Sequence, residues 1–137
     1  MLHLKIHLYT EALWALFNMF FLTRCDIAFT VNKFSQFLAA PTILHWQACK
    51  RVLRYLQSTS NYGLKFFNSG SLTLTAYPDA DWGSDPDDRR SVGGYYVFLG
   101  PNLISWSSKK QHIVSRSSAE SEYRALVLVK KLKPSLD

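Results

Sequence analysis

The sequence predicts a mixed α/β fold, in which N-terminal helices precede a three-stranded antiparallel sheet with one packed helix. Three observations support this prediction. Apolar residues recur at helical spacing through residues 10–58, β-rich runs follow between residues 72 and 106, and a helical pattern resumes after Ser117. Hydrophobic residues make up 47% and aromatic residues 15% of the 137-residue chain, which is typical of a packed core and excludes an intrinsically disordered chain.

Helices are predicted in three segments of the N-terminal part. The first two cover residues 10–23 and 27–38, where apolar side chains recur every three or four positions. The third, residues 42–58, starts after Pro41 and has the clearest amphipathic pattern. His45 in its first turn fits a capping or core role better than that of a metal ligand. The apolar face of this helix is formed by Cys49, Val52, Leu53 and Leu56.

Strands are predicted in three runs of the C-terminal part. The first, residues 72–79, alternates apolar side chains with polar or aromatic ones. The second covers residues 95–99, and a turn at Pro101-Asn102 leads to the third, which begins at residues 103–106. The closing helix is then capped by one of the serines at 117–118.

Two acids border this region in positions that suit a metal site. Asp79 ends the first strand, and Glu122 lies in the first turns of the closing helix. If they face each other across the sheet edge, they can hold a divalent metal beside a phosphate path. Each acid also has a purely structural explanation, as a turn residue or as a surface acid that compensates the helix dipole. We adopt the structural explanation for Asp81 and Glu120.

No part of the sequence is expected to lie in a membrane. Residues 12–22 form an apolar run interrupted by Asn18, which is shorter than the roughly 20 residues that cross a hydrocarbon core about 30 Å thick. Leu22-Thr23-Arg24 offers no small-residue signal-peptide cleavage site. Cys25 and Cys49 lack the spacing of zinc ligands, and such isolated thiols favour a reducing compartment. We therefore expect a cytoplasmic or nuclear location.

The positive charge is concentrated in the N-terminal part. The net charge is +6 at pH 7; residues 1–70 contain seven Lys and Arg against two acids, whereas residues 71–137 contain nine against eight. A basic part beside an acid-bearing part suits a polyanion held near a metal site. Ordinary solubility explains the same distribution.

Five basic residues are candidates for contacts with phosphates. Such contacts are non-specific and salt-sensitive. For the helix at residues 42–58 the alternative is a solvated face opposite a core stripe, as on most charged helices. The five candidates are Lys50, Arg51, Arg54, Lys109 and Lys110.

A cluster of charges lies between the first two predicted strands. It consists of Asp85, Asp87, Asp88, Arg89 and Arg90. We expect local turn hydrogen bonds and ion pairs there, each of which contributes little to stability.

Several long segments resemble a known family in order and spacing. AYPDADWGSDPDDRRS, GYYVFLG, LISWSSKKQ and SRSSAESEYRAL resemble the ribonuclease H domain of copia-type retrotransposon Pol polyproteins. LTRCDIAFTVNKFSQFLAAPTILHWQACKRVLRYLQST resembles the stretch just upstream. The resemblance implies that residues 1–60 are the helical end of the reverse transcriptase and connection region. It likewise implies that residues 61–137 are the N-terminal portion of a ribonuclease H-like domain.

The chemistry implied by the resemblance is hydrolysis of RNA in RNA–DNA hybrids during reverse transcription. Such nucleases use two divalent metals about 4 Å apart, held by a cluster of carboxylates. By resemblance, Asp79 in Tyr-Pro-Asp-Ala-Asp-Trp and Glu122 in Glu-Tyr-Arg-Ala-Leu are catalytic residues and ligands of Mg²⁺ or Mn²⁺. The family usually has Ser where this chain has Pro78.

The resemblance also implies that the catalytic centre is incomplete. In the family, later strands and helices carry a third and a fourth carboxylate, which this sequence lacks. We therefore expect a truncated fragment with weak or no activity and an open, adhesive sheet edge. The implied partners are an RNA–DNA hybrid or other nucleic acid and the remainder of a Pol polyprotein. The alternatives are a non-catalytic nucleic-acid-binding module and an inert retroelement remnant.

Overall fold

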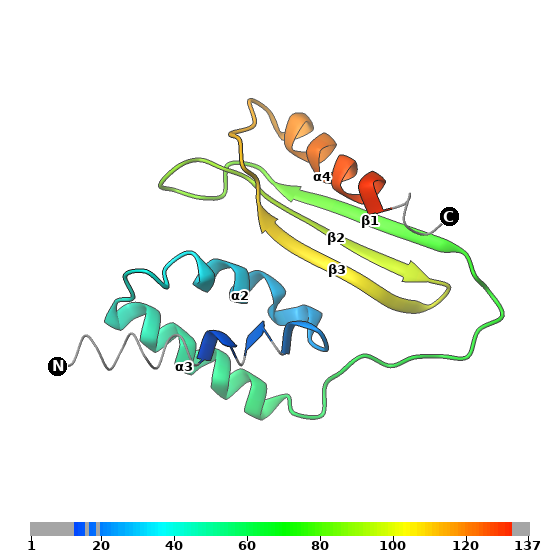
Figure 1. The fold of residues 1–137 in the computed structure, drawn as a ribbon, viewed down its shortest axis with the longest axis horizontal. Coiled ribbons are helices and arrows are strands. Elements are labelled where there is room, and N and C mark those ends of the chain that lie inside the picture. Colours follow the sequence, from blue (N-terminus) through cyan, green and yellow to red (C-terminus); the bar gives the residue numbers. More distant parts are fainter. Residues whose placement is uncertain (1–12, 16, 19, 133–137) are drawn as a thin grey trace. The chain divides into compact units, whose positions relative to one another are not determined.

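The predicted fold class is confirmed by a computed structural model, which describes residues 13–15, 17, 18 and 20–132 (Figure 1). The chain divides into two compact units, residues 1–64 and 65–137. The described elements of the first unit are helical, and the second unit contains a three-stranded sheet and a helix. The assignment of residues 1–60 and 61–137 to particular Pol regions stays a prediction.

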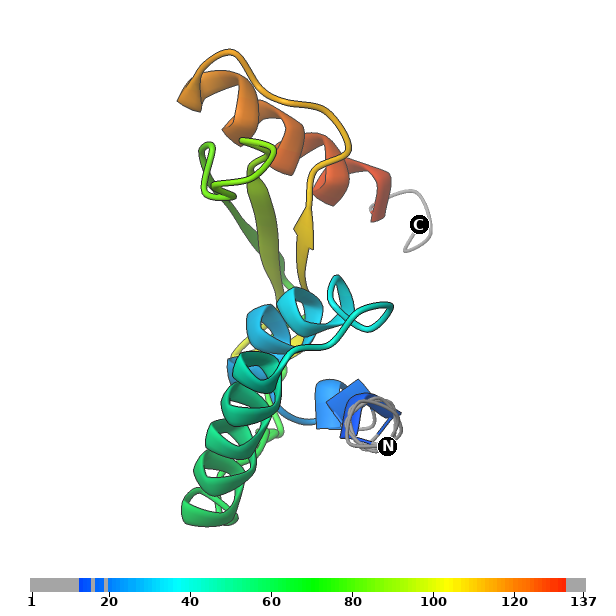
Figure 2. The same cartoon turned by 90° about the vertical axis from the view of Figure 1, so that its left-hand side faces the viewer.

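The first unit is built from helical segments. Residues 13–15, 17, 18, 20 and 21 are helical. They are followed by the 3₁₀ turn η1 (Cys25–Ile27) and by the helices α2 (Ala28–Ser35) and α3 (Ile43–Ser58). Helix α2 ends three residues before the predicted limit, whereas α3, whose turns are visible in Figure 2, agrees closely with its prediction.

A reciprocal cap begins α3. The hydroxyl of Thr42 accepts a hydrogen bond from the His45 N–H at 3.4 Å, and His45 Nδ1 accepts one from the Thr42 N–H at 3.1 Å. Two N–H groups that lack helical partners are thereby satisfied. The His45 ring also stacks on Phe37 at 4.3 Å between centroids. The predicted capping role of His45 is confirmed.

The core of the first unit joins α2 to α3. Phe17 is only 1% exposed and stacks on Phe34. Leu53, predicted to lie on the apolar face of α3, is 36% exposed and lies outside the buried cluster. The buried cluster consists of Phe17, Ile27, Val31, Cys49, Val52 and Leu56.

A buried arginine ties the start of η1 to the end of α3. The Arg24 guanidinium donates to both carboxylate oxygens of Asp26, at 3.0 and 2.8 Å. It also donates to the carbonyl and the hydroxyl of Thr59, at 3.0 and 2.7 Å. The Tyr55 hydroxyl donates to Asp26 Oδ2 at 2.5 Å. The Arg24 hydrogen bonds, followed by that of Tyr55, lower the pKa of Asp26 to about 2.

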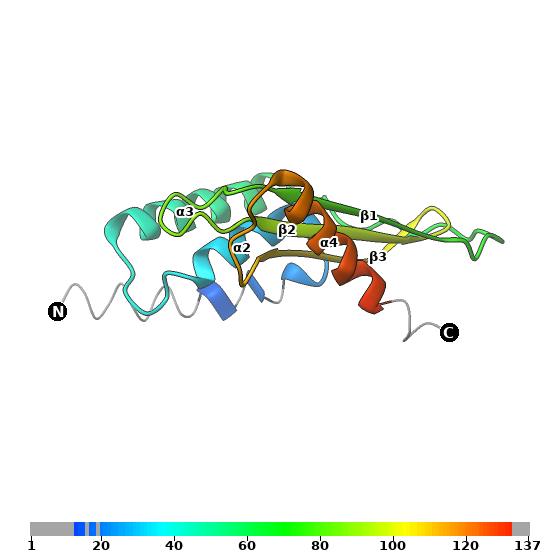
Figure 3. The same ribbon diagram turned by 90° about the horizontal axis from the view of Figure 1, so that it is seen from above.

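The second unit contains the sheet. The strands β1 (Leu74–Asp81), β2 (Val92–Leu99) and β3 (Asn102–Lys110) are antiparallel and lie in the order β1-β2-β3. Helix α4 (Ser118–Leu132) covers one face and packs on β1 and β2, as Figure 3 shows from above. Strand β1 starts two residues later than predicted and continues to Asp81, so Asp79 lies inside the strand rather than at its end.

Small side chains allow α4 to approach the sheet closely. Ser121 and Ala125 are fully buried on α4. A Cβ atom added at Gly93 of β2 would lie 3.8 Å from the Ala125 Cβ and 3.3 Å from Gln111 Nε2. The buried Gln111 amide donates to the Ser121 carbonyl at 3.0 Å and accepts from the Ser115 hydroxyl at 3.0 Å. The buried polar groups between α4 and the end of β3 therefore have hydrogen-bond partners within the protein.

A tight turn at Gly100-Pro101 joins β2 to β3. Gly100 has a φ of 55°, and a Cβ there would lie 2.8 Å from the Ser71 carbonyl oxygen, so only glycine fits without rearrangement. The Asn102 side chain exchanges two hydrogen bonds with the backbone of Phe67, at 2.7 and 2.9 Å. These bonds hold the segment before β1 against the hairpin.

No helix in the described part of the chain is long and apolar enough to cross a membrane.

The ion pair of Arg24 and Asp26 makes stability depend on pH. The pKa of Asp26 is about 2 in the fold and near 4 in an unfolded chain. The ionised carboxylate therefore stabilises the fold above about pH 4, and this contribution is lost as the pH falls toward 2. We expect Asp26→Asn to lower the free energy of unfolding at pH 7, because it removes this charged partner of Arg24. The expected loss is only about 1 kcal/mol, since the Asp26 side chain is 33% exposed and solvent partly screens the ion pair.

Urea titrations at pH 7 and pH 3 measure this difference. The difference in unfolding free energy between the parent chain and D26N should be smaller at pH 3 than at pH 7. Asp87→Asn, at an exposed loop position, is the control for removal of a carboxylate. A D26N variant as stable as the parent chain at pH 7 would contradict the assignment.

Candidate functional site

Asp79 is exposed in the second half of β1, one of the two edge strands of the sheet. It pairs with Gly94 across β1 and β2, and its Oδ1 accepts a hydrogen bond from the Ala80 N–H at 2.9 Å. Ala80 pairs with Gly93, which faces Ala125 of α4. Because side chains alternate along a strand, Asp79 and Asp81 lie on the face of the sheet away from α4.

Glu122 is exposed on α4. Its neighbour Ser121 is fully buried against the sheet. Helix α4 packs on β1, so Asp79 and Glu122 belong to elements in contact. Their carboxylates would have to meet around the outer edge of β1. Within the residues that the structure describes, no group of three or more His, Cys, Asp and Glu side chains is arranged to hold a metal ion.

Glu120 has a structural role at the start of α4. The Ser117 hydroxyl accepts from the Glu120 N–H at 3.2 Å, which confirms the predicted serine cap. Glu120 Oε1 accepts from the Arg124 guanidinium at 2.7 Å, and Oε2 accepts from the Arg116 N–H at 2.8 Å. These bonds, that of Arg124 first, lower the pKa of Glu120. Its expected structural function is confirmed.

The charged loop between β1 and β2 corrects one prediction. Asp85 is only 3% exposed, so its interactions are not those of a surface loop. The Lys110 ammonium, at the end of β3, lies 2.8 Å from Asp85 Oδ2 and 2.9 Å from Asp88 Oδ2. The Asp85 hydrogen bond is the main reason that the pKa of Lys110 is raised. The expected local turn bonding is present, since Asp85 Oδ1 accepts a hydrogen bond from the Asp87 N–H at 3.0 Å. The expectation that the ion pairs contribute little was wrong for Asp85, because this carboxylate is buried and its ion-pair partner Lys110 comes from β3.

The predicted phosphate contacts separate into engaged and accessible cations. Lys110 is held by the loop, and the Lys50 ammonium lies 5.8 Å from the centroid of the Trp46 ring on α3. Arg51 and Arg54 are exposed on α3, as is Lys109 at the end of β3. Among these five cations, the accessible ones are therefore Arg51, Arg54 and Lys109.

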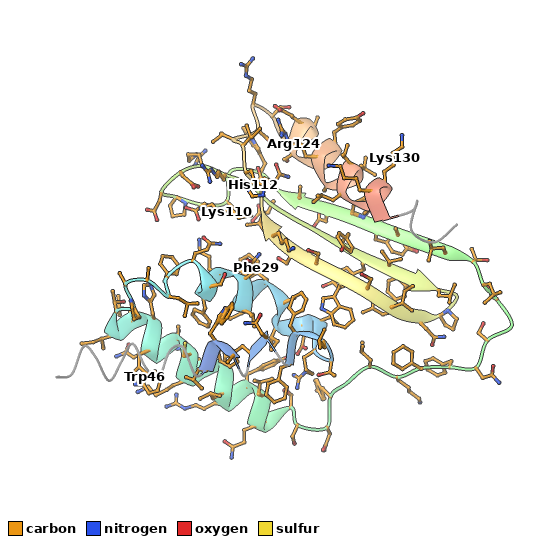
Figure 4. The ribbon with its side chains drawn as sticks, viewed as in Figure 1. Phe29, Trp46, Lys110, His112, Arg124 and Lys130 are labelled. Atoms are coloured by element: carbon orange, nitrogen blue, oxygen red, sulfur yellow. The ribbon has the colours of Figure 1, made fainter. Side chains whose placement is uncertain are left out.

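The end of β3 and one side of α4 enclose a groove that the sequence patterns did not indicate. Its volume is about 600 Å³. Figure 4 shows Lys110 and His112 near the end of β3 and Arg124 on α4. The apolar lining includes Ile113, Val127 and Leu128. The other lining residues are Lys109, Gln111, Glu120, Tyr123 and Lys131. A groove of this size, with basic residues around apolar ones, can hold part of an anionic ligand.

Comparisons with known proteins give three informative relatives. Secreted RxLR effector protein 161 of Plasmopara viticola is 49% identical over 118 residues, which cover 86% of this chain and 83% of that protein. The retrovirus-related Pol polyprotein from transposon RE1 of Arabidopsis thaliana is 54% identical over 104 residues, which cover 76% of this chain and 7% of the polyprotein. That from transposon TNT 1-94 of Nicotiana tabacum is 41% identical over 117 residues, which cover 85% of this chain and 9% of the polyprotein.

The chain thus spans less than a tenth of the length of these two polyproteins. No protein-family model and no solved structure matches it.

The two neighbouring lysines of β3 should respond differently to substitution. Lys110→Met removes the ammonium beside the buried Asp85, and we expect the free energy of unfolding to fall by about 3 kcal/mol. Lys109→Met changes an exposed side chain and should shift stability by less than about 0.5 kcal/mol. Urea denaturation of both variants measures the contrast, and equal stabilities would show that the loop does not depend on Lys110.

Proposed function

We propose that this retrotransposon-derived fragment, which is similar to retrovirus-related Pol polyproteins from transposons, corresponds to the copia-type ribonuclease H region with the end of the reverse transcriptase before it. Its ancestral chemistry is then metal-dependent hydrolysis of RNA in RNA–DNA hybrids. The observation that carries the proposal is the 54% identity to the RE1 polyprotein over three-quarters of the chain. The segments that resemble the family's ribonuclease H domain lie in the second unit.

The donor chemistry of the two proposed ligands fits Mg²⁺ or Mn²⁺. Both are exposed carboxylates, and oxygen ligands are those that hard cations prefer. Asp79 Oδ1 is engaged by the Ala80 N–H, whereas Oδ2 and the Glu122 carboxylate make no hydrogen bond within the described part of the chain. Bound metal would activate water and stabilise the leaving 3′ oxygen. Two carboxylates hold a two-metal centre weakly, so we expect slow hydrolysis by this chain alone.

Cleavage of a labelled RNA–DNA hybrid tests the nuclease proposal. We expect slow cleavage with Mg²⁺ or Mn²⁺ that Asp79→Asn and Glu122→Gln abolish. Asp81→Asn is the matched control, since Asp81 is also exposed on the same strand and face. Equal loss in D79N and D81N would indicate a general charge effect. No cleavage by a demonstrably folded chain would exclude the nuclease function.

A second candidate function is nucleic-acid binding without catalysis. It is favoured by Arg51 and Arg54, which are exposed on consecutive turns of α3, where residues three apart lie on one side of the helix. Such a pair can contact successive phosphates of a backbone, with affinity that falls as salt rises. The accessible Lys109 of the groove offers a similar charge in the second unit.

Fluorescence anisotropy with a labelled hybrid at several salt concentrations measures this binding. We expect the double variant Arg51→Gln and Arg54→Gln to weaken binding and to reduce the slope of log K against log salt by about two, one for each lost phosphate contact. Lys130→Gln, at an exposed position of α4, controls for loss of a positive charge elsewhere. An unchanged slope in the double variant would contradict a role for α3, and a folded chain that neither binds nor cleaves would support an inert remnant.

A further inference from the structure

The outer edge of β1 has a hydrogen-bonding pattern that follows from its register. Strand β1 ends the β1-β2-β3 sheet, with no strand on its outer side among the described residues. The Gly100 N–H donates to the Thr73 carbonyl at 2.8 Å. Thr73 and Gly100 lie next to the Leu74 and Leu99 pair, so they occupy a hydrogen-bonded position of the ladder. In an antiparallel ladder, pairs that exchange hydrogen bonds recur every second residue.

This alternation determines which backbone groups of β1 face outward. Residues 75, 77, 79 and 81 direct their N–H and C=O groups toward β2. The residues between them direct theirs away from the sheet. The four outward positions are Leu74, Ala76, Pro78 and Ala80. Pro78 thus occupies a position where its missing N–H does not disturb the ladder with β2.

Two of the four outward positions offer no free donor. Pro78 has no N–H at all. The N–H of Ala80 is already bonded to Asp79 Oδ1 at 2.9 Å. Only Leu74 and Ala76 can still donate to a further strand, and these span a stretch too short for a stable strand pair by itself.

We propose that Pro78 and the Asp79–Ala80 hydrogen bond block strand addition along the second half of β1, so that this chain does not pair with a second copy of itself along β1. A second copy laid along β1 would leave two of its carbonyl groups without donors, and buried carbonyl groups without partners disfavour pairing. The edge of β1, where the sequence predicts an adhesive surface, is therefore protected along its second half. This inference rests on sheet geometry and holds whether or not the chain is a nuclease.

Restoring the missing donor tests the proposal. Pro78→Ser supplies an outward N–H, and in a symmetric pair each copy contributes one additional hydrogen bond. We expect self-association about tenfold stronger than that of the parent chain, since about 1.4 kcal/mol corresponds to a factor of ten. Pro86→Ser, which removes a proline from the exposed loop between β1 and β2, is the matched control and should remain monomeric.

The measurement is molar mass by light scattering across a concentration series, with hydrogen exchange to locate the interface. Slow exchange of the new backbone amide at position 78 in associated P78S would support pairing at β1. A folded P78S that stays as monomeric as P86S would overturn the proposal. A parent chain that dimerises with its β1 amides protected would overturn it as well.

Two further pairs of substitutions separate this role from the proposed catalytic one and test the register. Asp79→Asn retains an oxygen acceptor for the Ala80 N–H, so it should leave the chain monomeric even if it abolishes cleavage, whereas Asp79→Ala should increase association. Ala76→Pro changes an outward position and should keep the fold, while Thr75→Pro removes a donor to β2 and should lower the urea midpoint. Equal damage by A76P and T75P would contradict the assigned register.

Discussion

The second unit depends on the close approach of α4 to the sheet. Gly93 on β2 and Ala125 on α4 leave so little space between the two elements that a larger side chain at Gly93 would displace the helix or Gln111. The Gln111 amide then ties the connection after β3 to the first turn of α4 through Ser121. With the helix fixed at this distance, Glu122 is directed to solvent, and the other side of α4 borders the groove.

Ionic contacts divide the basic residues of the chain into two groups. Arg24 and Lys110 each lie beside carboxylates, and Arg124 is bound to Glu120 one helical turn away. Their charges are largely neutralised, so they serve the fold more than a ligand. Arg51 and Arg54 remain exposed on α3, and an unneutralised charge is what attracts a polyanion over several ångströms. Net charge alone does not distinguish these groups.

Local patterns were sufficient to predict the elements but not their partners. The alternation before Asp79 and the amphipathic pattern after Pro41 identified β1 and α3, because strand and helix periodicities differ. The burial of Asp85 was not predictable, since its ion pair joins residues 25 positions apart. The groove also depends on two segments brought together by tertiary packing. Asp79 and Glu122 were identified as candidate metal ligands through the family resemblance. The side of the sheet on which Asp79 lies, and the exposed side of α4 on which Glu122 lies, became known only from the strand register and from the burial pattern of α4.

The order of the strands has a consequence for how the chain folds. Because spatial order equals chain order, each strand pairs with its sequence neighbour, and the β2–β3 hairpin closes over the Gly100-Pro101 turn. Contacts between near neighbours carry a small loop-closure cost, so topologies of this kind fold faster than those that join distant segments. During synthesis, β2 can pair with β1 soon after both have left the ribosome, before α4 is complete. The interval in which an unpaired strand is available to other nascent chains is correspondingly short.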